Sequence, residues 1–314
     1  MHESFSRRDF LLRSAAAASV AALGADAFST AQAAAESTKM TIAQWSGSGT
    51  PSAAQIQDAA VKMTQQAIEG LGGMKRFVGR GSVVWIKPNI GWDRVPELAC
   101  NTNPDVVATL IRLALDAGAK TVKVGDNPCD IAQKSYASSG IAEAAKKLGA
   151  EVVFLDRSRF REMDIRGERV KSLPVFPGIV ECDLVINVPI IKHHGLAGAT
   201  MCMKNYMGVI ENRKLFHQDI PACLVDITRF MKPQICVLDA VRILTAHGPR
   251  GGDPNDVALK MTLAAGVDPV ALDAWGAEVL GRKPEEIKSV VKGSEAGLGT
   301  MDYRLLSPKE IAVS

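Results

Sequence analysis

The sequence predicts an α/β fold with a mostly parallel sheet, helices on both faces and repeated strand–helix units. Short apolar runs such as 83–86 and 235–238 have the length and composition of buried parallel strands. Amphipathic stretches with helix-start and helix-stop residues separate these runs along the chain. Because a helix that joins two parallel strands crosses over in the right-handed sense, this alternation favours one open sheet.

Local signals place each element in turn. The clearest helix start is Thr102-Asn103-Pro104-Asp105, a capping residue followed by Pro and an acid, and Ala117-Gly118-Ala119 stops this helix. The more polar segment 157–181, which contains two prolines, is expected to form a hairpin or a small lobe. In chain order we predict strands at 82–86, 121–124, 152–155, 184–188 and 235–238, and helices at 53–77, 102–117, 139–148, 221–231 and 269–280.

Residues 1–33 are predicted to be a twin-arginine signal peptide, which leaves 34–314 as a single α/β domain. Ser6-Arg7-Arg8-Asp9-Phe10-Leu11 matches the export pattern, and Ala31-Gln32-Ala33 has the form of a cleavage site. We therefore expect the twin-arginine translocase as a partner and a folded protein in the periplasm or outside the cell. No later run is long enough to cross a bilayer, so no membrane span is expected after cleavage.

Composition narrows the classes of function. The formal net charge is +3 and no basic block interleaves with aromatic residues, so nucleic acid is not an expected partner. The six cysteines include no C-x-x-C pair, which makes an iron–sulfur cluster or a zinc ribbon unexpected. An oxidising compartment would allow disulfides, but their pairing cannot be read from the sequence.

Polar side chains follow several predicted strands at the point where each strand ends. These groups are Lys87 with Asn89, Asp126 with Asn127, the segment 192–194, and Asp239. In an open α/β sheet, ligands bind beyond the carboxyl ends of the strands. We therefore expect these side chains to share one site at one edge of the sheet.

The segment 187–217 is expected to be a glycine-rich loop that carries chemistry, because it holds three of the five histidines. His193 and His194 are adjacent and point opposite ways on extended backbone, so one at most faces the site. His194 and His217 could together hold a divalent metal or move protons. Lys204, framed by glycines, could pair with an anion or act as a nucleophile. Solvated side chains without chemistry are the alternative for each of them.

The motifs resemble the family known as domain of unknown function 362, from about Val83 to Gly299. That family implies an α/β fold and no settled activity. Some of its members carry a ferredoxin-like module with C-x-x-C-x-x-C repeats, which this chain lacks. The matching pieces are Ile86-Lys87-Pro88-Asn89, Val124-Gly125-Asp126, 183–189, Lys192-His193-His194, Lys204-Asn205-Tyr206-Met207-Gly208, His247-Gly248-Pro249 and 268–273.

The order of His194, Lys204 and His217 is also, more faintly, similar to that in the nickel-pincer lactate racemases. This similarity implies a nickel cofactor held covalently by the lysine, with the histidines as nickel ligands or as proton and hydride carriers. The chain departs from that pattern before Lys204, where Met201-Cys202-Met203 replaces a glycine triplet.

Together these features favour an exported enzyme that depends on a transition metal or another cofactor and acts on a small anionic substrate. Proton or hydride transfer, for example at a hydroxy acid, would make it an oxidoreductase or a racemase/isomerase. A periplasmic protein that binds a small anion without turnover, and a metal carrier or assembly factor, are the alternatives. We expect His194, Lys204 and His217 to be catalytic, His194 and His217 to bind the metal, and Lys87, Asn89, Asp126 and Asn205 to bind the cofactor or substrate.

Overall fold

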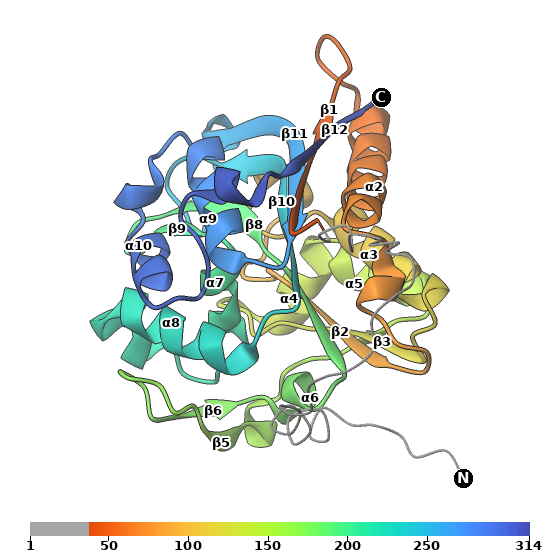
Figure 1. Ribbon diagram of the computed structural model, residues 1–314. Coiled ribbons are helices and arrows are strands. Elements are labelled where there is room, and N and C mark those ends of the chain that lie inside the picture. Colours follow the sequence, from red (N-terminus) through yellow and green to blue (C-terminus); the bar gives the residue numbers. More distant parts are fainter. Residues whose placement is uncertain (1–37) are drawn as a thin grey trace, which may run out of the picture. The chain divides into compact units, whose positions relative to one another are not determined.

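One ten-stranded sheet and one small hairpin contain the strands of the computed structural model, which describes residues 38–314 (Figure 1). The predicted signal peptide, residues 1–33, lies outside the described residues and stays a prediction. The strands are β1 (Met40–Trp45), β2 (Val83–Pro88), β3 (Thr121–Val124), β4 (Glu151–Val152), β5 (Arg161–Asp164), β6 (Ser172–Val175), β7 (Leu184–Val188), β8 (Ile190–His194), β9 (Gly198–Thr200), β10 (Ile235–Leu244), β11 (Val257–Gly266) and β12 (Lys309–Val313).

The large sheet is mostly parallel, as predicted. Its order is β12-β1-β11-β10-β7-β2-β3-β4, and β8 continues beside β10 with β9 at its other side. The pairs from β10 through β7, β2 and β3 to β4 are parallel, as are β8 with β10 and β1 with β12. Strand β11 lies antiparallel to both β1 and β10, and β8 is antiparallel to β9. The carboxyl ends of β2, β3 and β7 therefore lie at one edge, as the strand-end argument requires.

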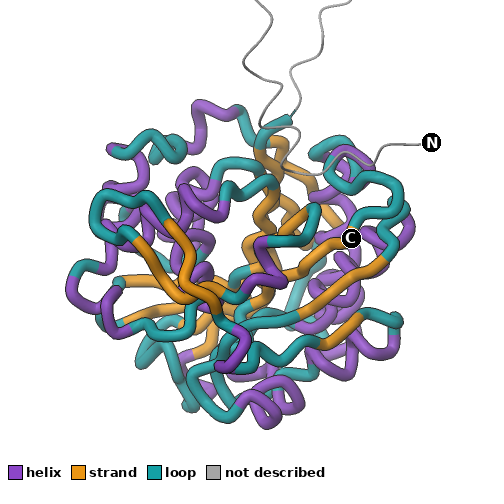
Figure 2. Tube along the Cα trace, turned by 90° about the horizontal axis from the view of Figure 1, so that it is seen from below, coloured by secondary structure: helices purple, strands orange, loops and turns teal. Residues whose placement is uncertain are grey.

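Helices cover both faces of the sheet, which confirms the predicted architecture (Figures 1 and 2). The helices are α2 (Ala53–Gly70), α3 (Pro104–Asp116), α4 (Ala132–Ser138), α5 (Ile141–Lys147), α6 (Pro177–Val180), α7 (Cys202–Asn205), α8 (Ile220–Met231), α9 (Pro269–Val279) and α10 (Lys288–Glu295). In β2, Val84 and Ile86 face one core with α2, α3 and α5, whereas Trp85 faces the other core with α7 to α10.

Helix boundaries follow their local signals, with two corrections. Helix α3 starts as predicted, because the Asn103 side chain accepts a hydrogen bond from the backbone N–H of Asp105. Helix α2 ends at Gly70 rather than at 77, because Gly72 and Gly73 take positive φ angles that stop a right-handed helix. The helix predicted at 139–148 is α5, which starts two residues later than predicted because Gly140 takes a positive φ; the preceding helix α4 was not predicted.

The prediction that Asp239 follows a strand is wrong. Strand β10 runs on to Leu244, so Asp239 lies inside the sheet, and its carboxylate accepts the N–H groups of Asn103 and Val241. The apolar run ends at Leu238, but β8 and β11 flank β10 beyond that point and give its backbone hydrogen-bonding partners. The glycine-rich loop predicted at 187–217 is also partly regular, since β8 and β9 pair as a hairpin and Cys202–Asn205 forms α7.

The polar excursion at 157–181 contains the expected hairpin, in which β5 and β6 pair antiparallel. The strand predicted at 152–155 covers only Glu151–Val152. All six cysteines of the chain are free thiols in this structure. Among the described residues, no helix combines the length and the apolar character that crossing a membrane requires.

Candidate active site at the carboxyl ends of β2, β3 and β7

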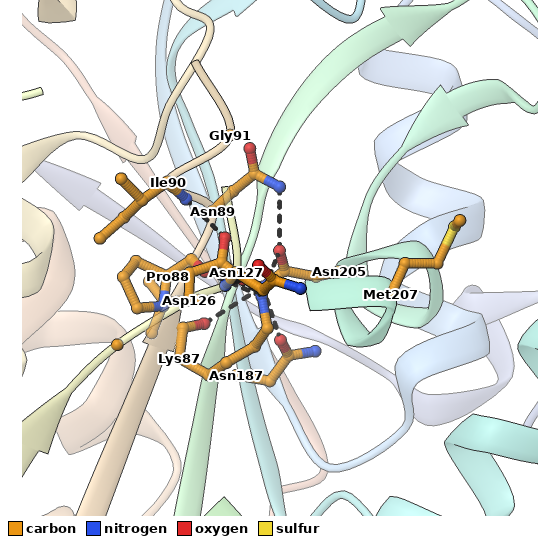
Figure 3. Close-up of polar contacts among 12 residues, drawn as sticks. Lys87, Pro88, Asn89, Ile90, Gly91, Asp126, Asn127, Asn187, Asn205 and Met207 are labelled. Carbon is orange, nitrogen blue, oxygen red and sulfur yellow. Dashed lines mark hydrogen bonds and ion pairs between the residues drawn. The ribbon is translucent and has the colours of Figure 1, made fainter. Parts of the chain in front are cut away.

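A buried polar network joins the ends of three strands to helix α7 (Figure 3). Lys87 Nζ donates to Asp126 Oδ1 at 2.7 Å and to Asn205 Oδ1 at 3.1 Å. The Asn205 amide nitrogen donates to Asn187 Oδ1 at 2.8 Å and to the Lys87 carbonyl at 3.1 Å. Asn89 Nδ2 also donates to Asn205 Oδ1, at 3.0 Å. These five residues, called the floor network below, fix the position of Asn205 through both ends of its amide.

The two charged groups of the floor network, Lys87 and Asp126, are paired with each other. Asp126 accepts not only Lys87 but also the backbone N–H groups of Ile90 and Asn127, which suits a buried carboxylate. Burial lowers the pKa of Lys87 from its ordinary value, and the adjacent Asp126 carboxylate opposes that effect. Lys87 is completely buried. It therefore holds the site together rather than reaching a ligand, although the sequence predicted it as a binding residue.

A cavity of about 70 Å³ lies above the floor network, with room for roughly five or six water-sized groups at about 10–15 Å³ each. It is far smaller than the roughly 300–1,000 Å³ of pockets that enclose drug-sized ligands. Only a small molecule, or one end of a larger one, fits inside. The cavity is lined by Asn89, Gly91, Trp92, Asp126, Asn127, Cys129, Lys192, His194, Thr200, Lys204, Asn205, Met207, Gly208, Arg213 and Pro249.

Lys204 lines this cavity with an ionisable group that has no hydrogen-bonding or ion-pair partner among the described residues. No hydrogen bond or ion pair joins its ammonium to any other residue within 38–314, although the side chain is half-buried. Burial, followed by the charges of Lys192 and Arg213, lowers the pKa of Lys204 to about 7. The amine is therefore half unprotonated near neutral pH, as an acid–base catalyst requires.

The helix that carries Lys204 is held at its start as well as at its end. Asp273 in α9 is buried, and its carboxylate accepts the N–H of Cys202 at 2.6 Å and that of Met203 at 3.1 Å. Asn205 locks the last residue of α7 into the floor network. Lys204 thus extends from a backbone that is fixed on both sides, which limits where its amine can lie.

Two further cations line the cavity: Lys192, which belongs to the strand-end group 192–194 expected at the site, and Arg213, which was not predicted. Lys192 donates to Asn89 Oδ1 at 2.8 Å and to the Cys100 carbonyl at 2.5 Å, and burial lowers its pKa to about 8. Arg213 donates to the carbonyls of Asn127 and Met207. No local signal marked Arg213, because it reaches the site through tertiary contacts.

His194 lines the cavity, whereas His193 does not. His194 Nδ1 accepts the N–H groups of Leu196 and Ala197, both at 3.2 Å, which assigns the ring proton to Nε2. Burial, followed by the charges of Lys204 and Lys192, lowers the pKa of His194 to about 3. The ring is therefore neutral at physiological pH and offers the cavity an N–H donor. The opposite orientation of His193 is as predicted, since its Nδ1 accepts the Gly248 N–H instead.

The hydrogen bonding of His194 does not fit metal ligation. A histidine that binds a metal through one ring nitrogen normally donates the other N–H to an acceptor, but Nδ1 of His194 is itself an acceptor. His217, the second predicted ligand, lines a different cavity with Gly195 to Gly198. Among residues 38–314, no three His, Cys, Asp or Glu side chains are grouped as a metal would require. The metal stays a prediction.

Thr200 is a further site residue that the sequence did not reveal. It lies opposite Lys192 in the β8–β9 hairpin and is 2% exposed. Its hydroxyl is buried and forms no hydrogen bond with any described residue, although Thr200 lines the cavity. A buried hydroxyl without a partner costs about 1–3 kcal/mol, so an arrangement of this kind points to a ligand that would bind it.

Comparison with known proteins confirms the family that the motifs resemble. Residues 84–278 match the model of the family described as Domain of unknown function (DUF362). The thylakoid-associated protein sll1697 of Synechocystis sp. is 28% identical over 260 residues, which cover 78% of this chain and 79% of that protein.

Two solved structures match part of this chain. The lactate racemase apoprotein from Thermoanaerobacterium thermosaccharolyticum has a TM-score of 0.47 at 14% sequence identity, over 76% of this chain. A Thermotoga maritima protein from a structural genomics consortium has a TM-score of 0.40 at 12% identity, over 77% of this chain. This chain spans 56% and 59% of the lengths of those two chains.

Proposed function

This chain belongs to the domain of unknown function 362 family, and we propose that it is an enzyme that transfers a proton at a small oxyanion-bearing substrate in the Lys204 cavity. The observation that carries the proposal is the Lys204 amine. It lines the cavity, forms no hydrogen bond with another described residue and has a pKa lowered to about 7.

The choice of an anion follows from which hydrogen-bonding groups the cavity leaves open. Lys204, the Nε2–H of His194 and the Thr200 hydroxyl can all donate to a ligand. Of the carboxylate and amide side chains that line the cavity, Asp126, Asn205 and Asn89 already accept hydrogen bonds from lysines. A ligand rich in acceptors, such as a carboxylate or a phosphate, suits a cavity of this kind and is also favoured by the charges of Lys192 and Arg213.

Lys204 would act as the base in such a site. Its neutral amine takes a proton from the substrate and becomes an ammonium, and the electron pair left behind becomes negative charge on the substrate. The ammonium of Lys192 and the guanidinium of Arg213 stabilise that charge, because they are fixed beforehand by bonds to Asn89 and Asn127. Lys204 then returns a proton, which completes an isomerisation or exchange without net change of charge.

No step of this proposal passes through a metal or an organic cofactor. The acceptor role of His194 Nδ1 and the place of His217 in another cavity do not fit the pair of metal ligands predicted from the sequence. A protein that binds a small anion without turnover is the second candidate, because the same open donors would hold an anion whether or not a proton moves.

The first test measures the reactivity of Lys204 as a function of pH. Trace acetic anhydride acylates only unprotonated amines, and mass spectrometry of peptides reports each lysine separately. We expect half-maximal labelling of Lys204 near pH 7, with protection by added phosphate or by a small carboxylate. The exposed Lys214 serves as the internal reference. Labelling of Lys204 that is complete only well above pH 9 would contradict the proposed base.

The second test looks for turnover. In D2O, NMR would follow exchange of the hydrogen next to the carboxylate in a panel of two- to four-carbon hydroxy and oxo acids. Where exchange occurs, Lys204→Met should reduce its rate by about 10²–10⁴-fold, the usual contribution of a positioned acid–base group. The matched control is Lys214→Met, which should not change the rate. Saturable binding without exchange of any panel member would favour the anion-binding protein.

A further inference from the structure

We propose a second oxyanion site, separate from the Lys204 cavity, at the amino-terminal end of helix α10. Its ligand would be the phosphoryl group of a small organic phosphate. The proposal does not rest on the function proposed for Lys204, because none of the residues that form the second site lines that cavity.

A large cavity holds the proposed site. Its volume is about 500 Å³, within the roughly 300–1,000 Å³ typical of ligand pockets. The β8–β9 turn forms one wall, and the start of α8 and the linker from α9 to α10 form others. Its lining residues are Gly195, Leu196, Ala197, Gly198, His217, Gln218, Asp219, Ile220, Pro221, Arg282, Glu286, Lys288 and Ser289.

Helix α10 presents unsatisfied N–H groups to this cavity. No side chain caps the helix, since the capping position is occupied by Ile287. The backbone N–H groups of Lys288 and Ser289, the first two residues of the helix, form no hydrogen bond with another described residue. In contrast, the start of α8 is capped by Asp219, whose carboxylate accepts the Ala222 N–H. Free N–H groups at a helix start attract anions.

Ser289 is the independent observation that points to a ligand. It is only 6% exposed, yet it lines the cavity, and no hydrogen bond joins its hydroxyl to any described residue. The hydroxyl oxygen of Ser289 is not among the fully buried polar atoms of the described residues, so it keeps open surface and can donate to a ligand in the cavity. Its hydroxyl and its own N–H stand on one short segment, so both can donate to the same oxyanion.

One cation that lines the cavity has no ion pair with a described residue. Arg282 pairs with Glu286 at 3.1 Å, and Asp219 is engaged as the cap of α8. Lys288 has no ion pair with a described residue and is exposed at the cavity. The site offers two N–H groups, a hydroxyl and an ammonium as donors, and helix N-termini commonly bind phosphate. These donors match the three terminal oxygens of a phosphate monoester, and the volume leaves space for its organic part.

Calorimetric titration tests the site with inorganic phosphate and glycerol 3-phosphate as probes. The full chain carries Lys204→Met throughout, which disables the first cavity. We expect Lys288→Ala with Ser289→Ala to weaken glycerol 3-phosphate binding at least tenfold. Lys292→Ala with Ser294→Ala, a matched pair at the other end of α10, should change it less than twofold. The single variant Lys288→Glu, a surface change, should also weaken binding and guards against misfolding of the double variant.

The outcomes distinguish an organic phosphate from inorganic phosphate as the ligand. They also distinguish failure of the second site from failure of the function proposed for Lys204. Tighter binding of glycerol 3-phosphate than of inorganic phosphate supports an organic phosphate. Binding that is equal in the Lys288/Ser289 and Lys292/Ser294 variants would overturn the second site. Binding that disappears in Lys204→Met alone would also overturn it, since the anion would then occupy only the first cavity. A result of either kind leaves the labelling test of Lys204 unaffected.

Discussion

Two lysines at the same cavity have opposite surroundings. Lys87 is completely buried and paired with Asp126 at 2.7 Å, whereas Lys204 is half-buried and has no partner among the described residues. Burial lowers the pKa of both, but only Lys87 has a carboxylate that restores its charge. A buried charge with a partner contributes to structure. A similar charge without one is available for chemistry.

The largest expected effect comes from breaking the Lys87 pair. Lys87→Met leaves Asp126 charged and buried, and we expect a loss of about 3–5 kcal/mol in the free energy of unfolding, measured by urea titration. Adding Asp126→Asn should recover part of that loss, because it removes the unpaired charge. Lys204→Met, the matched change at the other lysine, should cost far less. Equal losses for the two lysines would remove the distinction between them.

Overpacking the floor network is the next test. A Cβ at Gly208 would lie 2.7 Å from Lys87 Nζ and inside the van der Waals contact distance of Asp126 Oδ1. Gly208→Ala should therefore destabilise the protein by about 1–3 kcal/mol, as overpacking of a rigid site usually does. Gly195→Ala is the control, since nothing lies within 4 Å of the added carbon. If both substitutions are equally tolerated, the network is looser than its hydrogen bonds indicate.

The pKa of Lys204 predicts a pH dependence with a definite sign. Its pKa is about 7 in the folded protein, against an ordinary value of 10.5, so between these values the unfolded chain binds more protons. The free energy of unfolding should therefore rise with pH across this window, and this contribution is lost as the pH falls through about 7. Lys192, at about 8, adds a rise of the same sign.

Urea titrations of wild type and Lys204→Met from pH 8 to pH 10 isolate the contribution of Lys204 to this rise in the free energy of unfolding. The wild type should gain more stability than the variant over this range, by at most the effect of one proton. Asp239 and Asp273, whose pKa values are raised to about 6 and 7, complete most of their titration below it. Parallel curves for the two proteins would show that the folded state does not disfavour the Lys204 ammonium.

The smallest expected effect comes from removing the Thr200 hydroxyl, which should stabilise the protein rather than destabilise it. Thr200→Val removes a buried hydroxyl without a partner, and we expect stability to rise by up to about 1 kcal/mol while phosphate binding in the Lys204 cavity weakens. Thr228→Val is the control. Its hydroxyl in α8 is equally buried and unpartnered, but it does not line that cavity. Loss of phosphate binding in both variants would mean that Thr200 has no special role.

Much of the fold followed from local features of the sequence. The buried strands, the start of α3 at Asn103 and the polar residues after β2 and β3 depend on apolar runs and capping chemistry that a short window contains. Strands β1, β11 and β12 were not predicted. β1 and β12 lie toward one edge of the sheet, and β11 pairs both with β10, the preceding strand, and with β1, which is far from it in sequence. Their pairing is a property of the assembled sheet.

The candidate site shows the same difference between what local sequence features predict and what tertiary contacts set. Local sequence features predicted that Asn89, Asp126, His194, Lys204 and Asn205 would lie together at the strand ends of a parallel sheet. Tertiary contacts place Lys87 beneath the cavity and His217 in another one, and they bring Thr200 and Arg213 into the first. Burial and hydrogen-bonding partners are set by segments distant in sequence, and these decide which residues bind and which only support.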